Sequence, residues 1–292
     1  MKPGVPVTSG VGNPDYPIDS QVHTTLDRTI LPVSVPQGTP LIYPDQVANY
    51  SEYGYGAWRY ENGLPYQKRL DLMPSSYANT SATNGALLLH YFTMSDIHLA
   101  DKETPAQGIY AGYRGGNPSG YAAQMIMTTQ QLDAAIQTVN ALHLQKPFDF
   151  GMFLGDAINN NQYNELRWYI DIIDGKTINP DSGAKDDPVP GPLNDYQDPY
   201  KAAGLNSTIP WYQTLGNHDQ FWLGSYPRND YLSKTVTGVT ILNVENLTVD
   251  PTADFGKQGY YLGAIDGRTP LGAVIGAGPG KDFAEPPRVP AS

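Results

Sequence analysis

Three short clusters of Asp, His and Asn side chains stand out, because each follows an apolar stretch of the chain. The clusters are Asp-Ile-His at 96–98, Asp-Ala-Ile-Asn at 156–159 and Asn-His-Asp at 217–219. Carboxylate, amide and imidazole groups are ligands that Mn, Fe, Zn and Mg ions take in proteins. One such cluster is common in a surface loop or turn, but three in succession favour a metal centre.

Apolar strands are needed to bring these clusters together. The stretches 87–94, 148–154 and 209–215 are short, apolar and rich in aromatic residues, which predicts buried strands. The carboxyl ends of such strands meet at one edge of an open α/β sheet, where ligand sites gather. If the first strand continues past residue 94, Asp96 and His98 point to the same side, because alternate residues of a strand share a face.

Helices are predicted between these strands. Apolar residues recur at helical spacing over 128–144, with Thr128 or Thr129 as a candidate N-cap, and over 163–173, where Gly175 follows the pattern. Strands that alternate with helices are typical of the α/β class. A polar loop at 100–120 follows the first cluster, and its length places it at the rim of the expected site.

The composition excludes several kinds of protein. The net charge is −11, so no basic footprint for nucleic acid is present. The chain has no cysteine, which excludes disulfides, thiolate zinc sites and cysteine nucleophiles. No apolar stretch reaches the roughly 20 residues that a membrane span needs. The first residues lack the apolar core of a signal peptide. The sequence therefore does not assign the compartment, and the alternative is export to the periplasm with the signal peptide absent from this chain.

The composition changes along the chain. Residues 1–85 are rich in Pro, Gly and Tyr, which predicts a loop-rich N-terminal extension that wraps the core; a small separate β module is the alternative. Residues 86–292 form the main domain. Within it, glycines alternate with β-forming residues at 238–244, 259–265 and 271–275, which predicts antiparallel strands.

With Gly155 and Gly216 included, the three clusters resemble the first three sequence blocks of the calcineurin-like metallophosphoesterases in order and spacing. The resemblance covers about residues 86–270. The stretch 155–170 is also similar to an uncharacterised bacterial branch of that superfamily. The implied fold is a four-layer α/β sandwich, in which mixed sheets lie between helices.

The resemblance also implies roles for individual residues. The expected function is hydrolysis of a phosphomonoester or phosphodiester by attack of a hydroxide that bridges two metal ions, of Mn, Fe, Zn or a similar element. The first ion would be bound by Asp96 and His98, both ions by Asp156, and the second ion by Asn217.

The two remaining candidates would act on the substrate side. His218 would face the substrate phosphate, to stabilise the transition state or protonate the leaving oxygen. Asn159 stands where some relatives have Asp, at a position that helps to orient the catalytic histidine. The partner would be a phosphate-ester substrate, and the oligomeric state stays open.

The chain departs from the family pattern in one respect. That pattern has a further His and then Gly-His-x-His, whereas the five histidines here are at 23, 90, 98, 143 and 218. Three explanations stay open. The domain is incomplete at its C-terminus, which we expect; or carboxylates substitute, with Asp230, Asp254 and Asp266 as candidates; or the protein is an inactive metal-binding or scaffold member of the family.

Overall fold

The computed structural model describes residues 22–39, 52, 57–77, 86–101, 104, 125, 127–182 and 190–236. The strands predicted within 238–275 and most of the loop at 100–120 lie outside these residues, as do Asp254 and Asp266.

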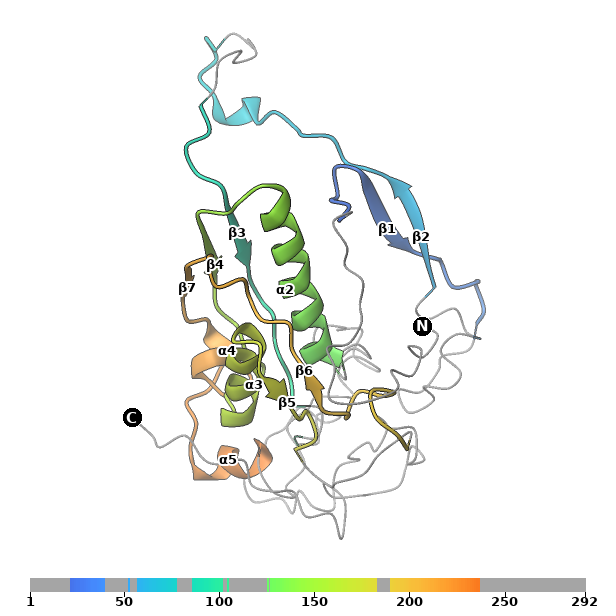
Figure 1. Cartoon of the computed structure of the whole chain (residues 1–292), viewed down its shortest axis with the longest axis vertical. Helices are drawn as coiled ribbons and strands as arrows, with labels where there is room; N and C mark the ends of the chain where they lie inside the picture. Colours follow the sequence, from blue (N-terminus) through green and yellow to red (C-terminus); the bar gives the residue numbers. More distant parts are fainter. Residues whose placement is uncertain are drawn as a thin grey trace.

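A three-stranded parallel sheet forms the centre of the described structure (Figure 1). Its strands are β3 (Tyr91–Met94), β4 (Phe150–Phe153) and β7 (Trp211–Gln213), in the order β3-β4-β7. All three were predicted, but each is shorter than its apolar stretch. Leu87–Leu89 precede β3 and are exposed, because the ladder that pairs with β4 begins only at Tyr91. The expectation of a buried strand from residue 87 is therefore wrong for these three leucines.

Two helices connect the strands and supply the core. Helix α2 (Thr128–Gln145) lies between β3 and β4, and α3 (Tyr163–Ile173) follows β4, close to the predicted bounds. The residue before α2 is Met127, and neither Thr128 nor Thr129 caps it; the Thr128 hydroxyl bonds to Ala100 O instead. A single apolar core joins both helices to the sheet; its most buried members are Leu99, Ile136, Phe153, Tyr169 and Ile172.

The two faces of the sheet differ. Phe92 and Phe153 point into the core, and a side chain at Gly151 would overlap the Phe92 ring. On the other face, Tyr91 is 49% exposed and Tyr212 is 60% exposed. Because alternate residues of a strand point to opposite faces, the buried strand residues share one face of the sheet, and the apolar core that includes residues of α2 and α3 lies on that face. The described elements thus leave the outer face of the sheet open.

The remaining elements are short. Antiparallel pairs are formed by β1 (Arg28–Pro32) with β2 (Trp58–Asn62) and by β5 (Thr177–Ile178) with β6 (Tyr200–Lys201). The others are η2 (Leu70–Leu72), α4 (Asn217–Gln220) and α5 (Asp230–Val236). Parallel and antiparallel sheets with helices confirm the predicted α/β class, and the architecture is consistent with a metallophosphoesterase fold.

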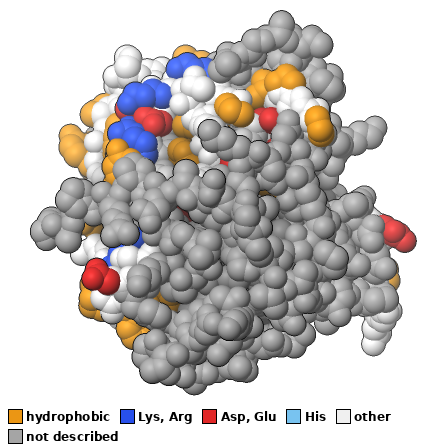
Figure 2. Space-filling model, turned by 90° about the horizontal axis from the view of Figure 1, so that it is seen from below, with side chains coloured by type: hydrophobic (Ala, Val, Ile, Leu, Met, Phe, Trp, Pro, Cys, Tyr) orange, Lys and Arg blue, Asp and Glu red, His pale blue; other side chains and the backbone are white. Residues whose placement is uncertain are grey.

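The surface of the described part is mixed in character. In the view from below, Lys and Arg side chains lie beside acidic and hydrophobic ones (Figure 2). Among the described residues, none of the helices combines the length and the apolar character needed to cross a bilayer.

Candidate metal centre

The three clusters lie at the carboxyl edge of the parallel sheet, the first two in loops and the third in the short helix α4. Beyond the strands, the first two loops stay paired: His98 N donates to Asp156 O at 2.9 Å, and Leu99 N donates to Ala157 O at 3.1 Å. An isolated parallel bridge joins Leu99 to Ile158. This backbone pairing fixes how the first and second clusters face each other.

Three candidate ligands have left-handed backbone conformations. The φ angles of Asp96, His98 and Asp156 are 55°, 46° and 52°. The strand expected to carry Asp96 and His98 is not formed, since β3 ends at Met94 and both residues follow it in irregular backbone. Their side chains still approach each other, with Asp96 Oδ1 3.8 Å from His98 Nε2. Non-glycine residues in this region cost about 1–3 kcal/mol each and persist where surrounding contacts hold them, often at functional sites.

The glycines before the second and third clusters allow the two loops to touch. A Cβ atom at Gly155, whose φ is +101°, would lie 2.6 Å from Gly216 N. A Cβ atom at Gly216 would lie 2.7 Å from Cγ of Asp156. Both positions therefore require glycine for the close approach of the two loops.

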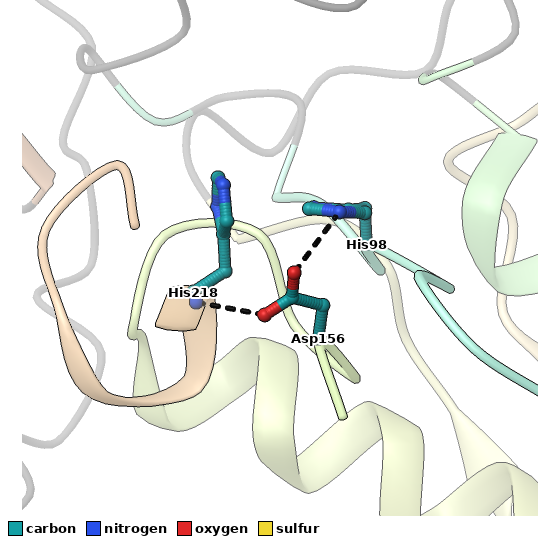
Figure 3. Close-up of side chains that lie close together, drawn as sticks. All are labelled: His98, Asp156 and His218. Carbon is teal, nitrogen blue, oxygen red and sulfur yellow. Dashed lines mark hydrogen bonds and ion pairs between the residues drawn. The ribbon is translucent and has the colours of Figure 1, made fainter. Parts of the chain in front are cut away.

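His98, Asp156 and His218 converge on one point. One ligand atom of each residue lies within 4.8 Å of the others, and the carboxylate lies beside the two imidazoles, whose ring centroids are 4.4 Å apart (Figure 3). His98 Nε2 is 3.6 Å from Asp156 Oδ2, and His218 N donates to Asp156 Oδ1 at 2.8 Å. Two imidazoles and one buried carboxylate form a donor set that suits divalent transition metals.

Asn159 orients both histidines. Its side-chain Oδ1 lies 3.1 Å from His98 Nδ1, and its carbonyl oxygen lies 2.7 Å from His218 Nδ1. Both oxygens are acceptors, so a hydrogen bond to each requires a proton on Nδ1 and leaves Nε2 of both rings as the nitrogen available to a metal ion. Metal-binding histidines are usually held in this way, with the second ring nitrogen bonded to an oxygen.

A model of the calcineurin-like phosphoesterase family matches residues 90–277. The chain belongs to the calcineurin-like phosphoesterase family. Searches of curated proteins and of solved structures each found no significant match. Membership indicates a metal-dependent phosphoesterase that acts on phosphate esters, and the convergence of metal-type ligands at the edge of the sheet fits that class.

The other two predicted ligands, Asp96 and Asn217, are both exposed. Asp96 is exposed, and its Oδ1 is 3.8 Å from His98 Nε2, while Ser95 Oγ donates to its other oxygen. Asn217 is exposed at the start of α4, where its Nδ2 donates to Gly224 O at 2.9 Å. The described structure therefore brings His218, predicted as a substrate-side residue, together with His98 and Asp156.

Asp219 joins the second and third loops of the phosphoesterase site. Its Oδ2 accepts from Gly216 N at 2.8 Å, which caps α4, and its Oδ1 accepts from Ile158 N at 3.2 Å. The sequence motif includes Asp219, but the motif alone does not indicate what this residue does. Its role depends on a contact across 61 positions of the chain.

Glu165 is a buried acid that the sequence analysis missed. It lies in the first turn of α3, and its exposed fraction is 0%. Burial raises the pKa of its carboxyl to about 8, against the lowering effect of hydrogen bonds from the N–H groups of Asp101 and Asn160. The only signal in the sequence is its position three residues before the buried Trp168, on the face of α3 that packs into the core.

The remaining histidines of the phosphoesterase have structural surroundings. His90 Nδ1 contacts Pro147 O, and its ring stacks on Phe148 at the start of the sheet. His143 Nδ1 accepts from Phe148 N, and its Nε2 contacts Thr208. His23 is exposed near β1. None of these three belongs to the ligand group found among the described residues.

Proposed function

We propose that this phosphoesterase hydrolyses a phosphate monoester or diester with two bound metal ions. The convergence of His98, Asp156 and His218 supports this proposal, because Asn159 contacts Nδ1 of each imidazole and leaves each Nε2 for other partners. The ions would be held by the predicted ligands Asp96, His98, Asp156 and Asn217. Divalent ions in such a centre act as Lewis acids toward phosphoryl oxygens and lower the pKa of water to about 7.

Asp156 is suited to a central place in the site. Its side chain is largely buried, and one carboxylate oxygen is fixed by the His218 N–H while the other faces His98. A buried carboxylate held in this way loses little conformational freedom when a cation binds. Its negative charge would also offset the positive charge of the ions.

His218 is suited to proton transfer to the leaving oxygen. Its Nδ1–H donates to the carbonyl of Asn159, so Nε2 is the nitrogen that can carry and release a proton. A Cβ atom at Gly224 would lie 2.6 Å from this Nε2, so the glycine leaves space around the nitrogen. The imidazole is therefore held at Nδ1, and its Nε2 lies beside the backbone of Gly224.

An inactive metal-binding protein is the second candidate. It is favoured by the absence of histidine from residues 219–292, since imidazole ligands expected on both ions are missing from the sequence. Among carboxylates that could replace them, Asp230 lies at the start of α5, in the first turn of that helix. Metal binding without turnover is the result that distinguishes this candidate.

Metal loading followed by an assay tests both candidates. The chain would be loaded with Mn²⁺, Zn²⁺ or Fe²⁺, its metal content measured by mass spectrometry, and hydrolysis of p-nitrophenyl phosphate and bis(p-nitrophenyl) phosphate followed. We expect turnover that depends on metal and is lost in Asp156→Ala and His218→Ala but kept in the control His23→Ala. Unchanged turnover in Asp156→Ala would contradict the proposal, and stoichiometric metal without turnover in the parent chain would support the second candidate.

A further inference from the structure

Glu165 lies at the end of the backbone pairing between the first two ligand loops. That pairing runs from His98 N, which donates to Asp156 O, to Asn159 N, which donates to Leu99 O at 3.0 Å. Beyond this pairing, Ala100 N donates to Thr128 Oγ1, and the N–H groups of Asp101 and Asn160 both donate to Glu165 rather than to the opposite loop. The carboxylate thus takes the place of the next rung between the two loops.

We propose that Glu165 is a positioning residue, whose carboxylate holds the first and second ligand loops in register so that His98 and His218 face Asp156. This inference rests on the proposed function, because it assigns to Glu165 a part in building the same metal centre. It goes beyond that function in naming a buried residue of α3 that touches none of the proposed ligands.

The two carboxylate oxygens of Glu165 serve different loops. Oε1 accepts from Asp101 N at 2.8 Å, in the loop that carries His98. Oε2 accepts from Asn160 N at 2.7 Å, in the loop that carries Asp156. Side-chain amides of Asn160 and Gln162 also donate to Oε1, at 3.2 and 3.3 Å. All four bonds come from the segments that flank the first two clusters.

The connection from Glu165 to the histidines passes through one peptide. Asn160 follows Asn159, whose side chain orients His98 and whose carbonyl accepts from His218. A shift of the Asn160 N–H therefore moves the residue that fixes both imidazoles. A displacement of about 1 Å is enough to weaken a catalytic arrangement strongly.

A carboxylate suits this position better than an amide does. Each carboxyl oxygen keeps a lone pair for a backbone N–H whether or not it carries a proton. The Nε2 group of Gln has no lone pair to offer, so in Glu165→Gln one of the two backbone donors faces another donor. An unsatisfied buried N–H is unfavourable, and the two loops are expected to separate at this point.

Binding of Co²⁺ tests the role of Glu165 without relying on activity. The visible absorption of bound Co²⁺ reports the geometry of its ligands, and titration gives the affinity. We expect Glu165→Gln to weaken Co²⁺ binding by about tenfold or more and to change the absorption bands. The matched control is Asp171→Asn, on the same helix, where Asp171 pairs with Arg167 at 2.8 Å and Lys176 at 3.1 Å. This control lowers thermal stability but keeps the parent affinity and spectrum.

A second variant keeps the inference testable if Glu165→Gln does not fold. Asn160→Ala removes one side-chain donor to Oε1 and leaves the carboxylate in place, so we expect the same change of spectrum with a smaller loss of affinity. A parent-like spectrum and affinity in the folded Glu165→Gln protein, or in Asn160→Ala where only that variant folds, would overturn the positioning role. If instead the parent chain binds no Co²⁺ and hydrolyses neither ester, the proposed function itself fails.

Discussion

Asn159 shows how one small residue can set the chemistry of two others. Its amide oxygen accepts from His98 and its carbonyl oxygen from His218, so a single residue fixes the tautomers of both imidazoles. The resemblance implies support for the catalytic histidine alone. The structure adds support for His98, because the side chain of Asn159 contacts His98 Nδ1.

Substitutions at Asn159 are expected to act in opposite directions. Asn159→Asp places a carboxylate beside His98 Nδ1–H, which makes Nε2 more basic and should tighten Zn²⁺ binding several-fold. Asn159→Ala leaves the imidazole unsupported and should weaken binding by about tenfold. Calorimetric titration of both variants measures the two shifts. Equal affinities in the two variants would contradict the assignment of Asn159 Oδ1 to His98.

Glu165 makes the stability of the fold depend on pH. Its pKa is about 8 in the native state and near 4.5 in the unfolded chain, so between these pH values the native state holds a proton that the unfolded state has released. The free energy of unfolding should therefore fall as the pH rises from about 4.5 to 8. Urea denaturation at pH 5 and pH 8 should show a smaller difference in Glu165→Gln than in the parent. Asp133, whose pKa is also raised by burial, is present in both proteins and cancels from the comparison.

At the scale of elements, the site is made by loops that the strands bring together. The loops after β3, β4 and β7 leave one edge of the parallel sheet, and the second and third approach backbone to backbone at Gly155 and Gly216. Asp219 then joins the same two loops by accepting from Gly216 N and Ile158 N. The strands fix the position of the loops, and the glycines fix their spacing.

A side chain at Gly216 should separate the loops. In Gly216→Ala the new Cβ lies 2.7 Å from Cγ of Asp156, so either the carboxylate or the loop has to move. We expect metal affinity to fall by at least about tenfold while the helical content measured by circular dichroism is kept. Gly38→Ala is the control, since no atom lies within 4 Å of the new Cβ at Gly38. Gly38 has a positive φ of +88°, whereas the φ of Gly216 is −96°, so any backbone strain from alanine falls on the control. Metal affinity that fell equally in both variants would rule out the close approach as the cause.

At the scale of the whole molecule, the described core lies on one face of the central sheet. Phe153 is 1% exposed and packs edge-to-face on Tyr169 and Trp211, whereas Tyr212 on the opposite face is 60% exposed. The stability of the described part should therefore depend on one side of the sheet far more than on the other.

Paired substitutions test this asymmetry. Phe153→Ala should lower the free energy of unfolding by about 3–5 kcal/mol, because it leaves a cavity in the core. Tyr212→Thr keeps a strand-forming residue and should change it by no more than about 0.5 kcal/mol. Urea denaturation of both variants gives the two values. A large loss in Tyr212→Thr would mean that the outer face is covered in solution.

The sequence by itself determined helices α2 and α3, the presence of strands β3, β4 and β7, and the three ligand clusters. The bounds of α2 and α3 follow from apolar spacing along the chain, and the clusters are visible because their members are neighbours in sequence. The ends of the strands were less well predicted, as at Leu87–Leu89, because an apolar stretch does not show which residues find ladder partners.

Only the tertiary structure decided how the clusters meet. The left-handed turns at Asp96, His98 and Asp156 are held by contacts with other loops, and no local pattern encodes them. The contacts of Asn159, Asp219 and Glu165 each join residues about 60 positions apart. Such pairs are set by the packing of strands and helices, which is why the metal-type ligands were predicted from the sequence while the residues that position them were not.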